Sequence, residues 1–131
     1  MNAPAILIDT SGLISFLRGD PAGAQVRLLL TEQRGVISAI SVYELFAGVR
    51  SEKHRGQRSR LVGLTRVLPV DDRIARRGAA LFTSLRQQGI TVDNEDLIIA
   101  ATALEQDLAL LSGNIRHFEA IPELRLMVPD R

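Results

Sequence analysis

The sequence predicts an α/β fold, namely a three-layer α/β/α sandwich with a short, mostly parallel central sheet. Short apolar runs without polar alternation, such as residues 5–8 and 108–111, are typical of strands buried on both faces. Segments with helical spacing of apolar residues separate these runs, and strands joined through helices pair in parallel. The length of 131 residues is that of an ordinary domain, so we expect one domain over residues 1–131.

Turn and capping residues mark the elements of the first half. Asp9 ends the first strand, and the apolar positions that follow it lie on one side of a predicted helix. Asp20 and Pro21 are typical of a helix start, since proline is favoured at the first helical position. Ser41 and Glu44 have the spacing of a capping box, which would open the third helix. We therefore expect strands at residues 5–8 and 36–39, and helices at residues 10–17, 21–33, 41–48 and 53–66.

The second half alternates in the same way. Pro69 suits an edge strand or a strand end, because proline donates no backbone hydrogen bond. Asp71 and Asp72 precede a long amphipathic helix that ends near Gly89. Residues 97–106 are apolar nearly all round, which is typical of a helix buried between layers. We expect strands at residues 67–70, 108–111 and 124–128, helices at residues 73–88 and 94–106, and one helical turn within residues 112–122.

The composition is that of a globular protein and excludes several kinds of site. Hydrophobic residues make up 46% of the chain and charged residues 24%, with a net charge of +1. The absence of cysteine excludes disulfides and thiolate-bound metals, which leaves oxygen-rich metal sites. No run of 18 apolar residues and no secretory leader pattern is present. We therefore expect a cytoplasmic protein that has no membrane partner.

Three carboxylates, Asp9, Glu44 and Asp96, follow strand-like runs or stand near the start of helices. Taken singly, they have simpler explanations as an N-cap, a capping-box residue and a first-turn acid. Because the carboxyl ends of parallel strands meet at one edge of a sheet, we expect the three side chains to gather there. Two like charges about 4 Å apart repel by roughly 4 kcal/mol at an effective dielectric near 20. Such a cluster predicts a bound cation or raised pKa values.

Four segments resemble the motifs of the PIN-domain family, in particular the VapC-type toxins of bacterial toxin–antitoxin pairs. They are ILIDTSGLISFL, ISVYELFAGV, NEDLIIAATAL and LLSGNIRHFEAIPELRL, and the resemblance covers residues 6–128. It implies a PIN-like ribonuclease that cleaves RNA phosphodiester bonds with Mg²⁺, for which Mn²⁺ would substitute. The acidic ligands of the family correspond to Asp9, Glu44 and Asp96, whose oxygens suit these ions.

In many PIN domains a fourth acidic residue stands where this chain has Asn114. We count Asn114 among the catalytic residues, although a neutral amide binds a divalent cation less strongly than a carboxylate. This departure favours one metal ion over two. Further candidates for a supporting or substrate-binding role are Ser11, Asp93, Ser112, Arg116 and His117. Local capping and turn hydrogen bonds are the alternative explanation for the serines. The preference for acidic residues at the start of a helix is the alternative explanation for Asp93.

Basic residues crowd the middle third of the chain and favour contact with a nucleic-acid backbone. They extend from Arg50 to Arg77, and Arg18, Arg86 and Arg116 lie outside this stretch. Arg116, beside Asn114, is the basic residue that we expect closest to the carboxylates. The resemblance implies an RNA substrate, a cognate antitoxin protein, and a homodimer or a hetero-oligomer with the antitoxin.

Two other functions are compatible with parts of the sequence. A phosphatase with Asp9 as nucleophile is disfavoured, since such enzymes usually need a second aspartate two positions on, where this chain has Ser11. A non-enzymatic PIN-like module that binds nucleic acid or a partner would keep the fold without the metal. Binding of Mg²⁺ or Mn²⁺ distinguishes this module from the ribonuclease.

Overall fold

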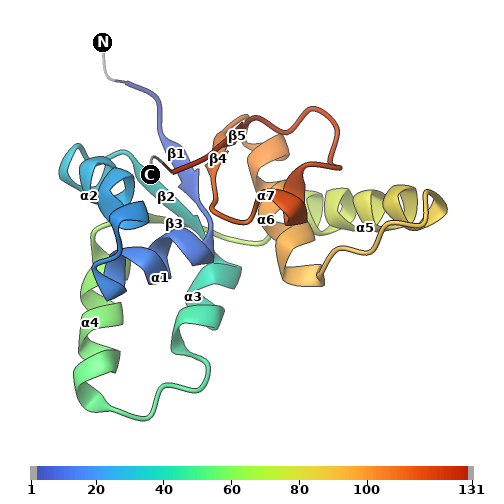
Figure 1. The fold of residues 1–131 in the computed structure, drawn as a ribbon. Coiled ribbons are helices and arrows are strands. Elements are labelled where there is room, and N and C mark those ends of the chain that lie inside the picture. The colour runs from blue at the N-terminus through green and yellow to red at the C-terminus, as the bar shows by residue number, and fades with distance from the viewer. Residues whose placement is uncertain (1–2, 130–131) are drawn as a thin grey trace.

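The computed structural model describes residues 3–129 and contains a five-stranded sheet with helices on both faces (Figure 1). The strands are β1 (Ile6–Ile8), β2 (Gly35–Ser38), β3 (Arg66–Leu68), β4 (Ala109–Leu111) and β5 (Leu126–Met127). Their order in the sheet is β3-β2-β1-β4-β5, and all neighbouring pairs are parallel. The predicted α/β/α fold is confirmed, and the edge position predicted for the third strand is correct.

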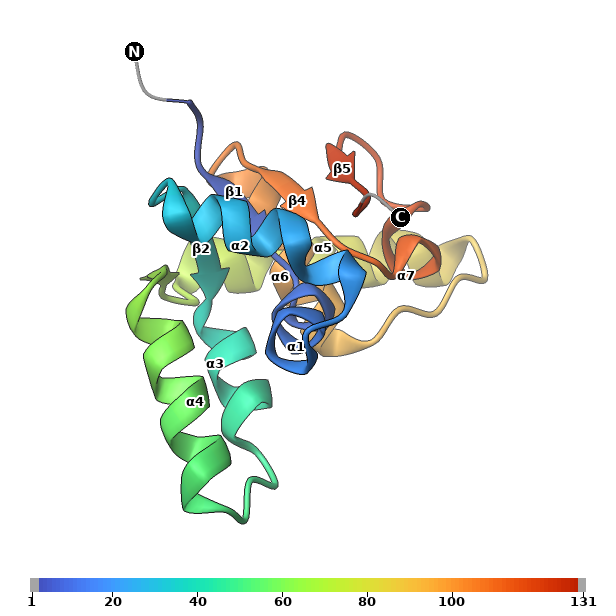
Figure 2. The same cartoon turned by 60° about the vertical axis from the view of Figure 1, so that its left-hand side comes forward.

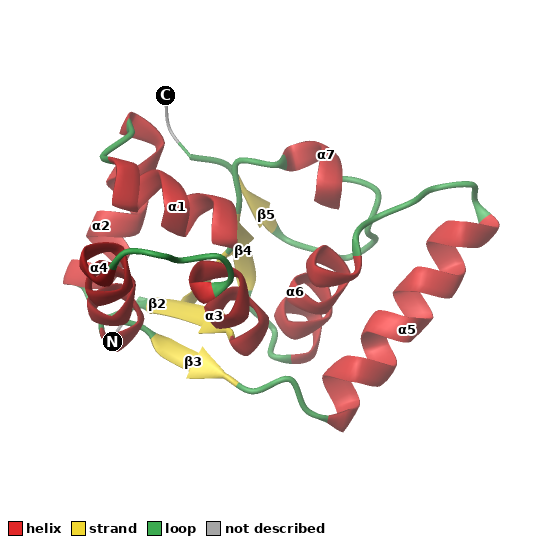
Figure 3. Ribbon diagram, turned by 90° about the horizontal axis from the view of Figure 1, so that it is seen from below, coloured by secondary structure: helices red, strands yellow, loops and turns green. Residues whose placement is uncertain are grey.

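The helices are α1 (Thr10–Arg18), α2 (Ala24–Thr31), α3 (Ala39–Phe46), α4 (Glu52–Gly63), α5 (Asp72–Gln87), α6 (Asn94–Glu105) and α7 (Ile115–Phe118). Alternate strand residues face opposite layers. Leu7 packs into a core with α5 and α6, whereas Ile6 and Ile8 pack into a second core with α1 and α2. Figures 2 and 3 show these two groups of helices on either side of the strands. Within residues 3–129, none of the helices has both the length and the apolar character needed to cross a membrane.

Helix α3 begins earlier than the sequence predicts. The Ser38 hydroxyl accepts a hydrogen bond from the backbone N–H of Ile40 at 3.1 Å, so Ser38 is the N-cap. Ser41 is fully buried within the helix. The predicted capping box of Ser41 and Glu44 is therefore wrong. Glu44 lies in the last turn of α3, and its position is not explained by capping.

The second predicted helix is divided into two parts. A short 3-10 turn, η1 (Pro21–Gly23), follows Asp20, and α2 starts only at Ala24. Gly23 is buried against α1, where an added Cβ would lie 2.6 Å from the Cα of Phe16. This close approach holds η1 against α1, and it requires glycine at position 23.

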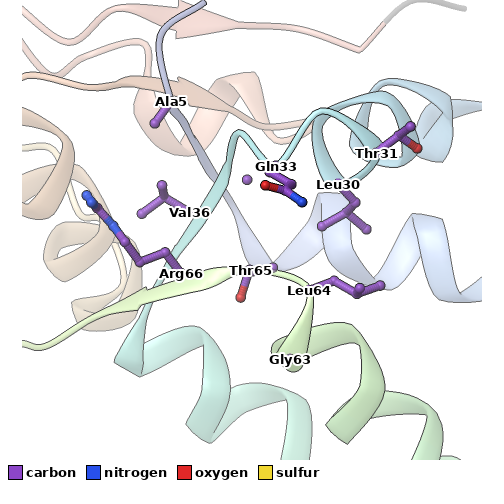
Figure 4. A pocket seen from close by; sticks show the side chains of 10 residues that line it. Ala5, Leu30, Thr31, Gln33, Val36, Gly63, Leu64, Thr65 and Arg66 are labelled. Atoms are coloured by element: carbon purple, nitrogen blue, oxygen red, sulfur yellow. The ribbon is translucent and has the colours of Figure 1, made fainter. Parts of the chain in front are cut away.

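The two ends of the parallel sheet have different surroundings. At the amino ends, a groove of about 420 Å³ lies between the end of α2 and the end of α4 (Figure 4). Ala5, Gly35 and Arg66 line it, next to the starts of β1, β2 and β3. At the carboxyl ends, Asp9 directly follows β1 and Ser112 directly follows β4. The predicted carboxylate site therefore lies at the opposite edge from this groove.

Candidate active site

A cleft of about 380 Å³ lies at the carboxyl edge of the sheet. Figure 2 shows α1, α3 and α6 gathered at this end of the strands. Five carboxylates line the cleft, and they are those of Asp9, Glu44, Asp93, Glu95 and Asp96. The three carboxylates predicted from the sequence are thus brought together, and two further acids join them.

The Asp9 carboxylate is almost fully buried, with 2% of the residue exposed. Its Oδ1 accepts a hydrogen bond from the backbone N–H of Thr10 at 2.8 Å, as an N-cap of α1 does. Its Oδ2 accepts hydrogen bonds from the hydroxyls of Ser11 at 2.9 Å and Ser112 at 2.7 Å. Asp9 therefore both caps α1 and lines the cleft in a position that hydrogen bonds fix.

Glu44 faces Asp9 from α3. The Thr10 hydroxyl donates to Glu44 Oε1 at 2.7 Å and lies 2.9 Å from the Ser41 hydroxyl. Burial raises the pKa of Glu44 above its usual range, and the charges of Asp9 and Glu95 raise it further, while the bond from Thr10 lowers it. Glu44 thus lies within the electrostatic reach of Asp9.

Asp96 stands in the first turn of α6, and His117 contacts it. His117 Nδ1 lies 2.9 Å from Asp96 Oδ2. Burial raises the pKa of Asp96 to about 6, and the charge of Asp9 adds to this rise, whereas His117 lowers it. Since the charge of Asp9 raises the pKa of both other carboxylates, the three form one electrostatic site.

Most of the predicted supporting residues lie in or directly behind the cleft. Asn114 lines it, and the backbone N–H of Asn114 donates to the Ser112 hydroxyl at 2.9 Å. Ser112 itself is buried behind Asp9. Asp93 lines the cleft as the N-cap residue of α6 but makes no capping hydrogen bond through its side chain. Its place at the start of α6 is one that the helix macrodipole favours for an acidic residue.

Arg116 does not occupy the predicted position. It is exposed on α7, and the arginine that lines the cleft is Arg18, from the last turn of α1. Thr10 and Glu95 also line the cleft and are absent from the predicted site. Helical spacing is the signal that finds Arg18, because it lies seven residues after Ser11 on the same face of α1.

The donors of the cleft fit a hard divalent cation in their chemistry. Mg²⁺ prefers oxygen ligands. The charge of Asp9 raises the pKa of both Glu44 and Asp96, and a bound cation would offset the repulsion among these carboxylates. Within residues 3–129, however, no three His, Asp or Glu side chains are arranged so that they already enclose an ion. Glu44 bonds Thr10, and Asp96 bonds His117.

Comparison with known proteins agrees with this geometry. A family model described as PIN domain matches residues 6–124. This chain belongs to the PIN-domain family. The matched range includes all four residues of the predicted catalytic set, namely Asp9, Glu44, Asp96 and Asn114.

Individual relatives resemble this PIN domain over nearly its whole length. Ribonuclease VapC19 of Mycobacterium tuberculosis is 36% identical over 121 residues, which cover 91% of this chain and 96% of VapC19. VapBC2 from Rickettsia felis, solved with a DNA fragment from its promoter, has a chain that matches with a TM-score of 0.84 at 23% identity, covering 96% of this chain and 99% of that one. A toxin–antitoxin complex from Klebsiella pneumoniae matches with a TM-score of 0.77 at 27% identity, covering 97% and 99%.

Proposed function

We propose that this PIN domain is a Mg²⁺-dependent endoribonuclease and the toxin of a toxin–antitoxin pair. The observation that carries the proposal is the gathering of Asp9, Glu44 and Asp96 in one cleft at the carboxyl edge of the sheet. The resemblance to VapC19, a protein named as a ribonuclease, supports the same activity. RNA is the proposed substrate, and the cleaved bond is a phosphodiester.

Asp9, Glu44 and Asp96 would hold the metal ion, with Asn114 beside them. When bound, Mg²⁺ supplies Lewis acidity towards a phosphate oxygen and activates water for attack on phosphorus. The chain's own contribution is to position the carboxylates. Ser11 and Ser112 fix one oxygen of Asp9, which cannot rotate without losing both bonds.

Thr10 and His117 position the other two acids, Glu44 and Asp96. Thr10 orients Glu44 through a single hydroxyl bond. His117 lowers the pKa of Asp96 and so favours the charged form that a metal requires. Both contacts prepare ionised oxygens in the cleft, because ligands must be deprotonated before they bind a cation.

We also propose that a cognate antitoxin binds this chain and keeps it inactive in a hetero-oligomer. The likeness to the Klebsiella toxin–antitoxin complex supports such a partner. Expression of the chain alone should arrest growth. Co-expression with its cognate antitoxin, to be sought among the neighbouring genes, should restore growth, and the antitoxin should co-purify with the chain. Purification of an active, partner-free chain from cells that express both proteins would contradict this part of the proposal.

The ribonuclease activity is tested with purified protein and total cellular RNA. Wild type should cleave RNA with Mg²⁺, and EDTA should abolish this cleavage. Asp9→Asn should lower the cleavage rate by more than about 100-fold, since even residues that only support metal ligands typically contribute 10–100-fold. Asp20→Asn is the matched control, because Asp20 is exposed, lies outside the cleft and makes no capping bond through its side chain. Full activity of Asp9→Asn would refute the assignment, and RNA binding without any cleavage by wild type would favour a non-enzymatic module.

A further inference from the structure

One face of α1 runs along the cleft, away from Asp9. Ser11, Ser15 and Arg18 lie on this face at spacings of four and three residues, and all three line the cleft. With a rise of 1.5 Å per residue, Arg18 lies about 10 Å along the helix axis from Ser11, which bonds Asp9. Leu13 points the other way, into the core. The cleft therefore extends along α1 from the buried Asp9 carboxylate to Arg18.

Arg18 is a cation without a partner in a cleft that is mostly acidic. Five carboxylates line the same cleft, yet the Arg18 guanidinium forms no ion pair or hydrogen bond with any residue that the structure describes. The Ser15 hydroxyl has no hydrogen-bond partner among these residues either. An arginine that neutralised the acids would be paired with one of them. The donors of Arg18 are thus available to an anion from outside the protein.

We infer that Arg18, together with the Ser15 hydroxyl, binds a backbone phosphate of the RNA adjacent to the one that is cleaved. This inference rests on the proposed ribonuclease function. The planar fork of guanidinium donors matches the oxygens of a phosphate. Because Arg18 lies along α1 from Asp9, it contacts the RNA at a distance from Asp9. RNA is a polyanion, so its binding in a cleft with five acids requires a positive charge nearby. Arg18 supplies this charge without forming an ion pair with the carboxylates that would hold the metal.

Arg18 also stands in the last turn of α1, where a basic residue stabilises the helix through the macrodipole. That role needs only a positive charge, and lysine supplies it. Bidentate binding of a phosphate needs the guanidinium. Arg18→Lys should therefore unfold at the same temperature as wild type but bind RNA more weakly, with an affinity between those of wild type and Arg18→Ala.

Arg66 offers a matched control. It is exposed, and its side chain forms no ion pair or hydrogen bond within residues 3–129. It lies in the groove at the amino ends of the strands (Figure 4). Arg66→Ala and Arg18→Ala each remove one positive charge from an exposed arginine. They differ in the edge of the sheet from which the charge is removed. Equal weakening of RNA binding by the two variants would therefore indicate general attraction of RNA to a basic protein and not a site at Arg18.

The test is RNA affinity across a series of salt concentrations, measured by the anisotropy of a short fluorescein-labelled RNA of mixed sequence. The arginine variants are made in the full chain carrying Asp9→Asn, so that the RNA is not consumed. Arg18→Ala should weaken binding about tenfold, the loss of one hydrogen-bonded charge contact. The slope of log affinity against log salt should become shallower by about 0.7–0.9. Arg66→Ala should leave both the affinity and the slope unchanged.

The same pair of variants in the otherwise wild-type chain gives a second measurement. Cleavage of total cellular RNA by Arg18→Ala should show a raised KM with kcat within about twofold of wild type, the pattern of a lost binding contact. Suppose that wild type cleaves RNA, but that Arg18→Ala binds RNA as tightly as the Asp9→Asn chain from which it was made, or that Arg66→Ala weakens binding equally. The proposed role of Arg18 would then be wrong, while the proposed ribonuclease function would still hold. If wild type does not cleave RNA, the proposed function falls and the role of Arg18 falls with it.

Discussion

At the scale of single residues, Asp9 shows why a simple explanation and a functional one can both hold. Its Oδ1 caps α1. Its Oδ2 accepts hydrogen bonds from Ser11, two residues away, and from Ser112, which is distant in the sequence. Capping predicts the first bond but not the buried bond from Ser112. The hydrogen bond of 2.7 Å from Ser112 to Asp9 therefore distinguishes the two explanations, because a helix cap alone has no need of a buried partner from the residue that follows β4.

Asp96 carries a testable pH dependence of stability. The pKa of Asp96 is about 6 in the folded, metal-free protein, whereas the usual pKa of an aspartate, expected in the unfolded chain, is 3.8. The folded state therefore binds the proton at higher pH than the unfolded state does. Stability from this group is therefore gained as pH falls from above 6 towards 4, and the charged form is unfavourable at pH 7. Asp96→Asn should raise the free energy of unfolding at pH 7 by about 1 kcal/mol, after allowance for solvent screening of a partly exposed group.

This difference should shrink as the pH approaches 4, where Asp96 is protonated in wild type. Urea denaturation in EDTA at both pH values measures it. Asp20→Asn, outside the cleft, should change the free energy of unfolding by less than about 0.5 kcal/mol at either pH. An Asp96→Asn chain that is less stable than wild type at pH 7 would show that the charge of Asp96 is already compensated without a metal.

At the scale of elements, the start of α3 shows what local sequence leaves open. Ser38 and Ser41 are three residues apart, and either is a favourable N-cap. The choice depends on where β2 ends, and β2 continues to Ser38 because it pairs with Leu68 of β3. Strand pairing is a long-range interaction, so the capping pattern by itself predicts the wrong serine.

The packing of η1 on α1 predicts opposite effects for two glycine substitutions. Gly23→Ala should lower the free energy of unfolding by about 1–3 kcal/mol, because the new Cβ would lie 2.6 Å from backbone of Phe16. Gly56→Ala, at a half-buried position inside helix α4, should raise it by about 0.5–1 kcal/mol, since the nearest atom to its Cβ is the end of Arg60 at 3.6 Å. Thermal unfolding of both variants gives the comparison. Equal stability of the two would mean that η1 is not packed as described.

At the scale of the whole molecule, the order of the sheet brings the distant carboxylates together. β1 lies between β2 and β4, so Asp9 adjoins both the helix that follows β2 and the residue that follows β4. Alternation of strands and helices is sufficient to predict this meeting point. The arginine at the cleft is harder to predict, because Arg116 lies on a helix of only four residues whose orientation depends on tertiary packing. Arg18 lies on a nine-residue helix with a clear buried face, and its position follows from helical spacing.

In the proposed function, Asp9, Glu44 and Asp96 act together on a divalent cation to cleave RNA. The most direct measurement is the rate of cleavage of total RNA as Mg²⁺ is added to wild type and to Asp96→Asn. We predict that wild type is inactive in EDTA and that its rate rises to saturation with Mg²⁺, while Asp96→Asn stays at the rate seen in EDTA. Cleavage by wild type in EDTA, or an Asp96→Asn curve that follows that of wild type, would contradict the claim.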